Sequence, residues 1–191
     1  MGRQPRLLVP GGVYHVGCRA VRQLELFVTD RDRALMLALL RLALARFRWR
    51  CHSFCLLTSH VHWLLETEDP NLSSGMHWLN TTYARIFNRR HGFSGHVFDR
   101  RFWSALVDGE VQFATTARYI DLNPVRAGAC VDPADYEWSS FRFTTGMARS
   151  SILTTSTLVS LFGADPSRAA TEYARFVRDE LETGMPPVDH L

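Results

Sequence analysis

The segment from Cys51 to Glu68, CHSFCLLTSHVHWLLETE, constrains the fold more than any other stretch of the chain. It is rich in apolar residues and is interrupted by the polar pair Thr58 and Ser59, so it predicts either two strands joined by a turn or one long bent strand. Side chains on a strand alternate between its two faces. One face would therefore carry His60, His62 and Leu64, and the core-facing side would carry Val61, Trp63 and Leu65.

Strand and helix patterns alternate on both sides of this segment. The predicted order is a strand over 11–20, a helix over 29–50, the 51–68 segment, a helix over 71–92, a strand over 94–109 and a helix over 110–123. We expect the last of these helices to end near Asn123, because Pro124 disfavours helical geometry in the residue before it. This order predicts an α+β fold with a ferredoxin-like antiparallel sheet, helices on one face and one added helix.

Charge divides the 191 residues into a basic body and an acidic tail. Residues 1–150 hold 19 Arg against 13 Asp and Glu, and residues 151–191 hold 3 Arg against 6. We predict one main domain over 1–150 and a C-terminal helical tail over 151–191, whose helix at 166–184 should be peripheral. All 22 basic residues are arginine, a side chain well suited to phosphates and bases.

Compartment and redox state follow from what the sequence lacks. It has no apolar stretch of the ~20 residues that a membrane span needs, and its N-terminus has no secretory signal pattern. We expect a cytoplasmic protein with reduced cysteines. Cys51 and Cys55, four apart on a strand, would lie ~13 Å apart, beyond the ~7 Å reach of a disulfide.

Two pairs of polar residues at regular spacing could carry chemistry. His60 and His62 would be neighbours on one strand face, ~6.5 Å apart at Cα, either sharing a metal ion or forming a partly buried, hydrogen-bonded pair. Tyr119 and Asn123, four apart on a helix, would share a face, and Tyr119 could be a nucleophile or an ordinary core hydroxyl. Two imidazoles and one amide oxygen together form an incomplete shell of the kind a catalytic Mg²⁺ or Mn²⁺ site needs.

With these residues the sequence resembles the HUH single-strand DNA endonucleases, and among them the REP-associated tyrosine transposases. The similarity runs from VPGGVYHV through SHVHWLLE and YIDLNPVRAG to DYEWSSF, over roughly residues 8–143. The resemblance implies that His60, His62 and Asn123 bind the metal and that Tyr119 is the nucleophile. It also places the tyrosine-bearing helix against the metal-site face of the sheet.

The resemblance implies metal-dependent nicking and strand transfer at hairpin DNA of the repetitive extragenic palindrome type, through a 5′-phosphotyrosine intermediate. A monomer is favoured, and a homodimer is possible. One alternative is a domesticated nucleic-acid-binding protein that no longer transposes. Another is a metal-dependent phosphodiesterase that uses water as its nucleophile.

The chain departs from the family pattern at Thr58, at Asp99 and Trp103 in FDRRFW, and at Asp121, where histidine is frequent. These departures affect the expected DNA sequence preference. None of them falls on the inferred metal ligands or on the inferred nucleophile.

The stretch RIFNRRHGFSGHVFDRRFW interleaves arginines with aromatic residues, which suits single-stranded DNA because phosphates need cations and unpaired bases need stacking partners. The phenylalanines here are expected to be core residues. We expect five arginines to contact DNA, namely Arg85, Arg89, Arg90, Arg101 and, in the tyrosine motif, Arg126.

Overall fold

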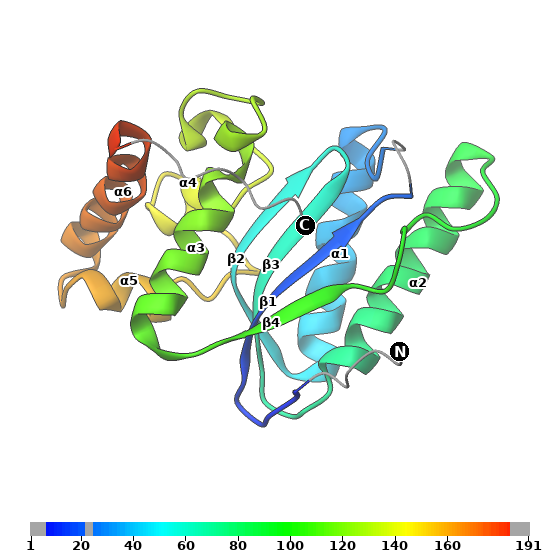
Figure 1. Cartoon of the computed structure of the whole chain (residues 1–191), viewed down its shortest axis with the longest axis horizontal. Coiled ribbons are helices and arrows are strands. Elements are labelled where there is room, and N and C mark those ends of the chain that lie inside the picture. The colour runs from blue at the N-terminus through cyan, green and yellow to red at the C-terminus, as the bar shows by residue number, and fades with distance from the viewer. Residues whose placement is uncertain (1–6, 22–24, 184–191) are drawn as a thin grey trace.

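A four-stranded antiparallel sheet separates two layers of helices in the computed structural model, which describes residues 7–21 and 25–183 (Figure 1). The strand order is β2-β3-β1-β4. The strands are β1 (Val13–Arg19), β2 (Trp49–Leu57), β3 (His60–Thr67) and β4 (Trp103–Val107). The helices are α1 (Asp30–Phe47), α2 (Leu72–His91), α3 (Gly109–Arg126), α4 (Phe141–Thr144), α5 (Ser156–Val159) and α6 (Pro166–Thr183), with 3₁₀ turns η1 (Pro133–Asp135) and η2 (Ser160–Phe162). The predicted α+β fold with an antiparallel sheet is confirmed.

The 51–68 segment forms two strands, β2 and β3, that turn at Thr58 and Ser59. The predicted alternation along β3 is observed. Val61, Trp63 and Leu65 join the core beneath α1 and α2, whereas Leu64 joins a second core on the opposite face. One strand therefore contributes to both cores and still presents its histidines on the second face.

The layer on the second face consists of α3 and the C-terminal helices (Figure 1). Helix α6, expected to be peripheral, is amphipathic and buries Ala169, Tyr173, Ala174 and Val177. Three of these residues, Tyr173, Ala174 and Val177, belong to the same core as residues of α3. The acidic tail thus helps to hold the tyrosine-bearing helix in place.

Two predicted boundaries were wrong. Helix α3 continues through Pro124 to Arg126 instead of ending near Asn123. The missing amide of Pro124 falls in the last turn, and the side chain of Asn123 donates to the carbonyl of Tyr119 at 2.8 Å, which supports the helix at this point. The strand expected over 94–109 is ordered as β4 only from Trp103 to Val107, and residues before it form a loop with one isolated bridge from Phe98 to Ala20.

All four cysteines are free thiols, as predicted. Cys51 and Cys55 are fully buried, and burial raises the pKa of both thiols. Within the described ranges, no helix is both long enough and apolar enough to span a bilayer.

Candidate active site

The two histidines of the H-x-H motif lie on β3, and a third histidine from β1 joins them. Residues 15 of β1 and 64 of β3 are register partners, so His15 projects from the same face as His62. The Nε2 atom of His15 lies 3.0 Å from Nδ1 of His62. His60 makes a similar contact through its own Nδ1, which lies 3.1 Å from the Oγ atom of Ser59. Both motif histidines therefore use Nδ1 within the protein and keep Nε2 for a ligand.

Burial favours the neutral form of all three imidazoles. It lowers the pKa of His15 to about 4. Burial, together with the positive charge of Arg19, lowers the pKa of His60 to about 4. The pKa of His62 falls well below its ordinary value because of burial and of its neighbours His15, His60 and Arg19. A neutral imidazole protonated at Nδ1 presents a lone pair at Nε2, which is the form that binds metals.

Tyr119 lies directly on this cluster. Helix α3 packs against β2 and β3, and the ring of Tyr119 contacts two of the histidines. The ring centroids are 5.8 Å apart for Tyr119 and His62, and 5.6 Å apart for Tyr119 and His15. The structure thus brings together the tyrosine and the histidine motif, which are separated by nearly sixty residues in the sequence.

Asn123 follows Tyr119 by one helical turn and is 4% exposed. Its Nδ2 atom donates to the Tyr119 carbonyl at 2.8 Å. Because this bond occupies the amide nitrogen, Oδ1 is the atom that Asn123 can offer to a ligand. A metal held by His60 and His62 would need further ligands, and the amide oxygen of Asn123 has suitable chemistry for this.

Trp103 closes the cluster on the side of β4. Its ring lies 4.6 Å from that of His15 and 6.0 Å from that of His62, measured between centroids. Gly17 makes this position possible, because a Cβ atom at residue 17 would lie 2.2 Å from Nε1 of Trp103. His15, Gly17 and Trp103 were not identified as site residues from the sequence. The only local signal was that side chains along β1 alternate between its two faces. This alternation does not reveal which strand pairs with β1.

Arg126, one of the arginines expected to contact DNA, is instead packed against Tyr119. Its guanidinium carbon lies 4.7 Å from the centroid of the Tyr119 ring, and its side chain is 6% exposed. It forms an ion pair with Glu180 of α6, and Arg118 pairs with the same carboxylate at 2.5 Å. A phosphate could reach Arg126 only if its pair with Glu180 opened. In this arrangement Arg126 packs on the ring of Tyr119.

The other four predicted DNA contacts lie at the C-terminal half of α2 and in the loop before β4. Arg85, Arg89 and Arg101 are exposed. Arg90 forms an ion pair with the buried Asp32 of α1 at 3.0 Å, which gives it a structural role. Arg19, not singled out from the sequence, is exposed on the histidine face and is the register partner of His60.

Asp121 lies two residues from Tyr119 and faces the interior instead of the histidines. It is completely buried and accepts hydrogen bonds from Tyr173 at 2.7 Å and from Ser140 at 2.5 Å, with Ser53 at 3.4 Å. Burial raises its pKa to about 7, although these three hydroxyls oppose the shift. Asp121 therefore ties the tyrosine helix to α6, α4 and β2.

This raised pKa gives a pH dependence of stability that can be measured. The folded state keeps the Asp121 proton up to about pH 7, whereas the unfolded state loses it near pH ~4, so the folded state binds more protons in that window and stability falls as pH rises. Asp121→Asn lacks this titration. We compare the free energy of unfolding of Asp121→Asn with that of the wild type by urea titration at each pH. The value for the variant minus the value for the wild type should rise by up to about 4 kcal/mol between pH ~4 and pH ~8.

The control for this prediction is Asp69→Asn, at an exposed position before α2. This variant makes the same chemical change at an exposed side chain, so it shows how much of the effect depends on burial. A difference between Asp121→Asn and the wild type that does not change with pH would contradict the prediction.

This chain has relatives among known proteins. Residues 9–123 match the model of the family described as "Transposase IS200 like". A protein of Haemophilus influenzae assigned as a REP-associated tyrosine transposase is 28% identical over 100 residues, which cover 47% of this chain and 57% of the relative. The match thus spans little more than half the length of that relative. The resemblance noted from the motifs is confirmed.

A solved structure supports the fold independently. It is the structure of a REP-associated tyrosine transposase bound to a REP hairpin, with a TM-score of 0.66 and 17% sequence identity. The match covers 80% of this chain and 90% of the solved chain. Because the family model covers residues 9–123, including both the histidine motif and Tyr119, this chain belongs to the IS200-like transposase family.

Proposed function

We propose that this chain is a metal-dependent single-strand DNA endonuclease and strand transferase that acts at hairpin sequences of the repetitive extragenic palindrome type. One observation carries the proposal, namely the packing of Tyr119 against His62 of the same chain at 5.8 Å between ring centroids. A tyrosine used only for packing needs no pair of neutral imidazoles whose Nε2 atoms are left for a ligand. A tyrosine nucleophile that attacks a phosphate beside a metal ion needs such a pair to hold the metal.

In the proposed reaction the phenolic oxygen of Tyr119 attacks the scissile phosphorus. A bond forms between this oxygen and phosphorus, and the bond from phosphorus to the 3′ oxygen breaks. The phenolic proton is lost and the departing 3′ oxygen gains a proton, so the products are a 5′-phosphotyrosine and a free 3′-OH. Attack by a 3′-OH on the phosphotyrosine reverses these changes and joins strands without another energy source.

The chain's own residues hold the reacting groups in place. Arg126, itself paired with Glu180, packs on the ring of Tyr119. His15 fixes the ring of His62 through the contact at 3.0 Å, as partners of metal-binding histidines commonly do. His60, His62 and Asn123 would hold the cation, Mg²⁺ or Mn²⁺, which supplies charge neutralisation at the scissile phosphate.

A monomer with its tyrosine acting in cis fits the connection between the sheet and the tyrosine helix. Strand β4 ends at Val107 and α3 begins at Gly109, so only Asp108 joins them. Such a short connection keeps Tyr119 close to the sheet from which the helix departs. A hairpin partner is supported by the solved structure of a REP-associated tyrosine transposase, which is bound to a REP hairpin.

The test is to incubate the protein with single-stranded hairpin oligonucleotides that carry a 5′ or 3′ flank, in the presence of Mn²⁺. We expect a covalent protein–DNA adduct that survives denaturing electrophoresis and a released strand with a 3′-OH. Binding without cleavage would instead support a domesticated binding protein. Cleavage without an adduct would support a phosphodiesterase that uses water.

A further inference from the structure

Glu180 of α6 bridges two arginines of the tyrosine helix. Its carboxylate pairs with Arg118 at 2.5 Å and also with Arg126. Arg118 directly precedes Tyr119, and Arg126 follows it by about two helical turns, so the bridge spans the part of α3 that carries the candidate nucleophile. Residue 180 lies outside the segment that matches the family model, and the reaction proposed above assigns no step to it.

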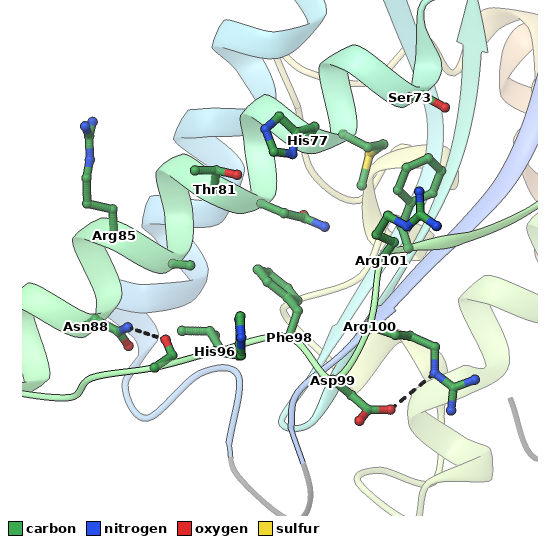
Figure 2. Close-up of a pocket in the computed structure, with 16 residues that line it drawn as sticks. Ser73, His77, Thr81, Arg85, Asn88, His96, Phe98, Asp99, Arg100 and Arg101 are labelled. Carbon is green, nitrogen blue, oxygen red and sulfur yellow. Dashed lines mark hydrogen bonds and ion pairs between the residues drawn. The ribbon is translucent and has the colours of Figure 1, made fainter.

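This bridge is buried, in contrast to the ion pairs on the surface. The side chains of Glu180 and Arg126 are 11% and 6% exposed. Figure 2 shows an exposed pair, Arg100 with Asp99, in the loop before β4, where the arginine side chain is 78% exposed. Breaking such a pair costs little, because water solvates both charges. Removing one partner of a buried pair instead leaves an uncompensated charge, which must move toward water or another carboxylate.

Arg126 links Glu180 to the ring of Tyr119. The guanidinium carbon lies 4.7 Å from the centroid of this ring, within the ~6 Å range of a cation–π contact. The same ring meets those of His15 and His62 edge to face. Among the described residues, Arg126 has no ion-pair partner other than Glu180. Loss of the Glu180 charge would therefore free the guanidinium group and remove one of the contacts that hold the ring.

The position of Glu180 is fixed by the packing of α6 itself. Tyr173 and Val177 are fully buried in the same core as residues of α3. They precede Glu180 by seven and three residues and so lie on the same side of α6. The guanidinium carbon of Arg118 also lies 4.2 Å from the centroid of the Phe176 ring. These contacts place the carboxylate without any contribution from the arginine that packs on the tyrosine ring.

The orientation of the Tyr119 ring matters for the proposed chemistry. Attack on a phosphate requires the reacting atoms to be aligned at ~3–3.5 Å before the bond forms. Rotation about either torsion of the tyrosine side chain would move the phenolic oxygen relative to the histidines. We propose that Glu180 is a positioning residue for the nucleophile, because it keeps Arg126 on the ring of Tyr119 and the ring against the histidines. This inference rests on the function proposed above.

The first test measures adduct formation in a single turnover, with saturating hairpin oligonucleotide and Mn²⁺. For Glu180→Gln we expect the rate constant to fall ~10- to 100-fold, as when a reacting group is slightly misplaced. Affinity for the hairpin, measured by fluorescence anisotropy without Mn²⁺, should stay the same. The control is Glu172→Gln, which makes the same change on α6 but breaks only an exposed pair with Arg175. This variant should react at the wild-type rate.

Two further variants separate positioning of the ring from docking of α6. Arg118→Gln removes an ion pair with the same carboxylate and the contact with Phe176, but leaves Arg126 on the ring. It should react at nearly the wild-type rate even if its melting temperature falls. Arg126→Gln removes the guanidinium group directly and should slow the reaction as much as Glu180→Gln, with little further loss when the two are combined. Rates that simply follow melting temperature would overturn the proposal.

A spectroscopic test observes the ring without metal or DNA. In protein labelled with 3-fluorotyrosine, ¹⁹F NMR should give signals from five tyrosines, and the signal missing from Tyr119→Phe identifies Tyr119. Glu180→Gln should shift or broaden this signal, whereas Glu172→Gln should not, and the remaining signals show whether each variant is folded. An unchanged Tyr119 signal, or a wild-type rate of adduct formation in Glu180→Gln, would refute the positioning role alone. A wild type that forms no adduct would refute the nicking function itself.

Discussion

Replacing Tyr119 with phenylalanine is expected to abolish the covalent protein–DNA adduct and to leave hairpin binding intact. The variant removes only the attacking oxygen, while the ring keeps its contacts with His15 and His62. Removal of a nucleophile costs at least ~10³-fold in rate in comparable covalent mechanisms. Denaturing electrophoresis of labelled oligonucleotide measures the adduct, and a shift assay in native gels measures binding.

The matched control is Tyr136→Phe. The hydroxyl of Tyr136 donates to the carbonyl of Leu56 at 2.8 Å, so this variant also removes one phenolic oxygen from a partly buried tyrosine. It should form the adduct at the wild-type level. An adduct that persists with Tyr119→Phe would remove Tyr119 from the role of nucleophile.

Local patterns predicted the parts of the fold that depend on neighbouring residues. Strand alternation placed Val61, Trp63 and Leu65 in the core and left the motif histidines on the other face, because burial of one strand face fixes the register of every side chain. The spacing of Tyr119 and Asn123 on one helix face was likewise visible from helical periodicity.

Contacts between distant segments could not be predicted in this way. His15 joins His62 only because β1 pairs with β3, across 47 residues of sequence. Arg126 was expected to contact DNA, but Glu180, 54 residues away, pairs with it. Both depend on which elements become neighbours, and that is decided by packing of whole faces rather than by any local pattern.

Asp121 illustrates the same limit at a single position. A carboxylate in a helix is usually solvent-facing, yet here it is buried among three hydroxyls from three other segments of the chain. Only the arrival of Ser53, Ser140 and Tyr173 makes that burial tolerable. Its partner on α6 also explains why the acidic tail is not peripheral.

Replacing His62 with alanine is the second change expected to have a very large effect. The loss of one imidazole from the proposed metal site should weaken Mn²⁺ binding, which isothermal titration calorimetry can follow without DNA. Since a catalytic cation contributes several kcal/mol of charge stabilisation, nicking should fall ~10³-fold or more. His60→Ala should behave in the same way, because both side chains present a free Nε2 atom from the same strand face.

Mixing two inactive variants then decides whether the site is complete within one chain. If Tyr119 acts on the histidines of its own chain, as the single-residue connection at Asp108 favours, a mixture of His62→Ala and Tyr119→Phe should remain inactive. Each chain would lack one essential part, and neither could borrow it. Restored adduct formation in the mixture would show that the tyrosine helix reaches a partner's histidines, and the reaction would then require a dimer. Unchanged Mn²⁺ binding by both His60→Ala and His62→Ala would instead remove these two residues from the metal site.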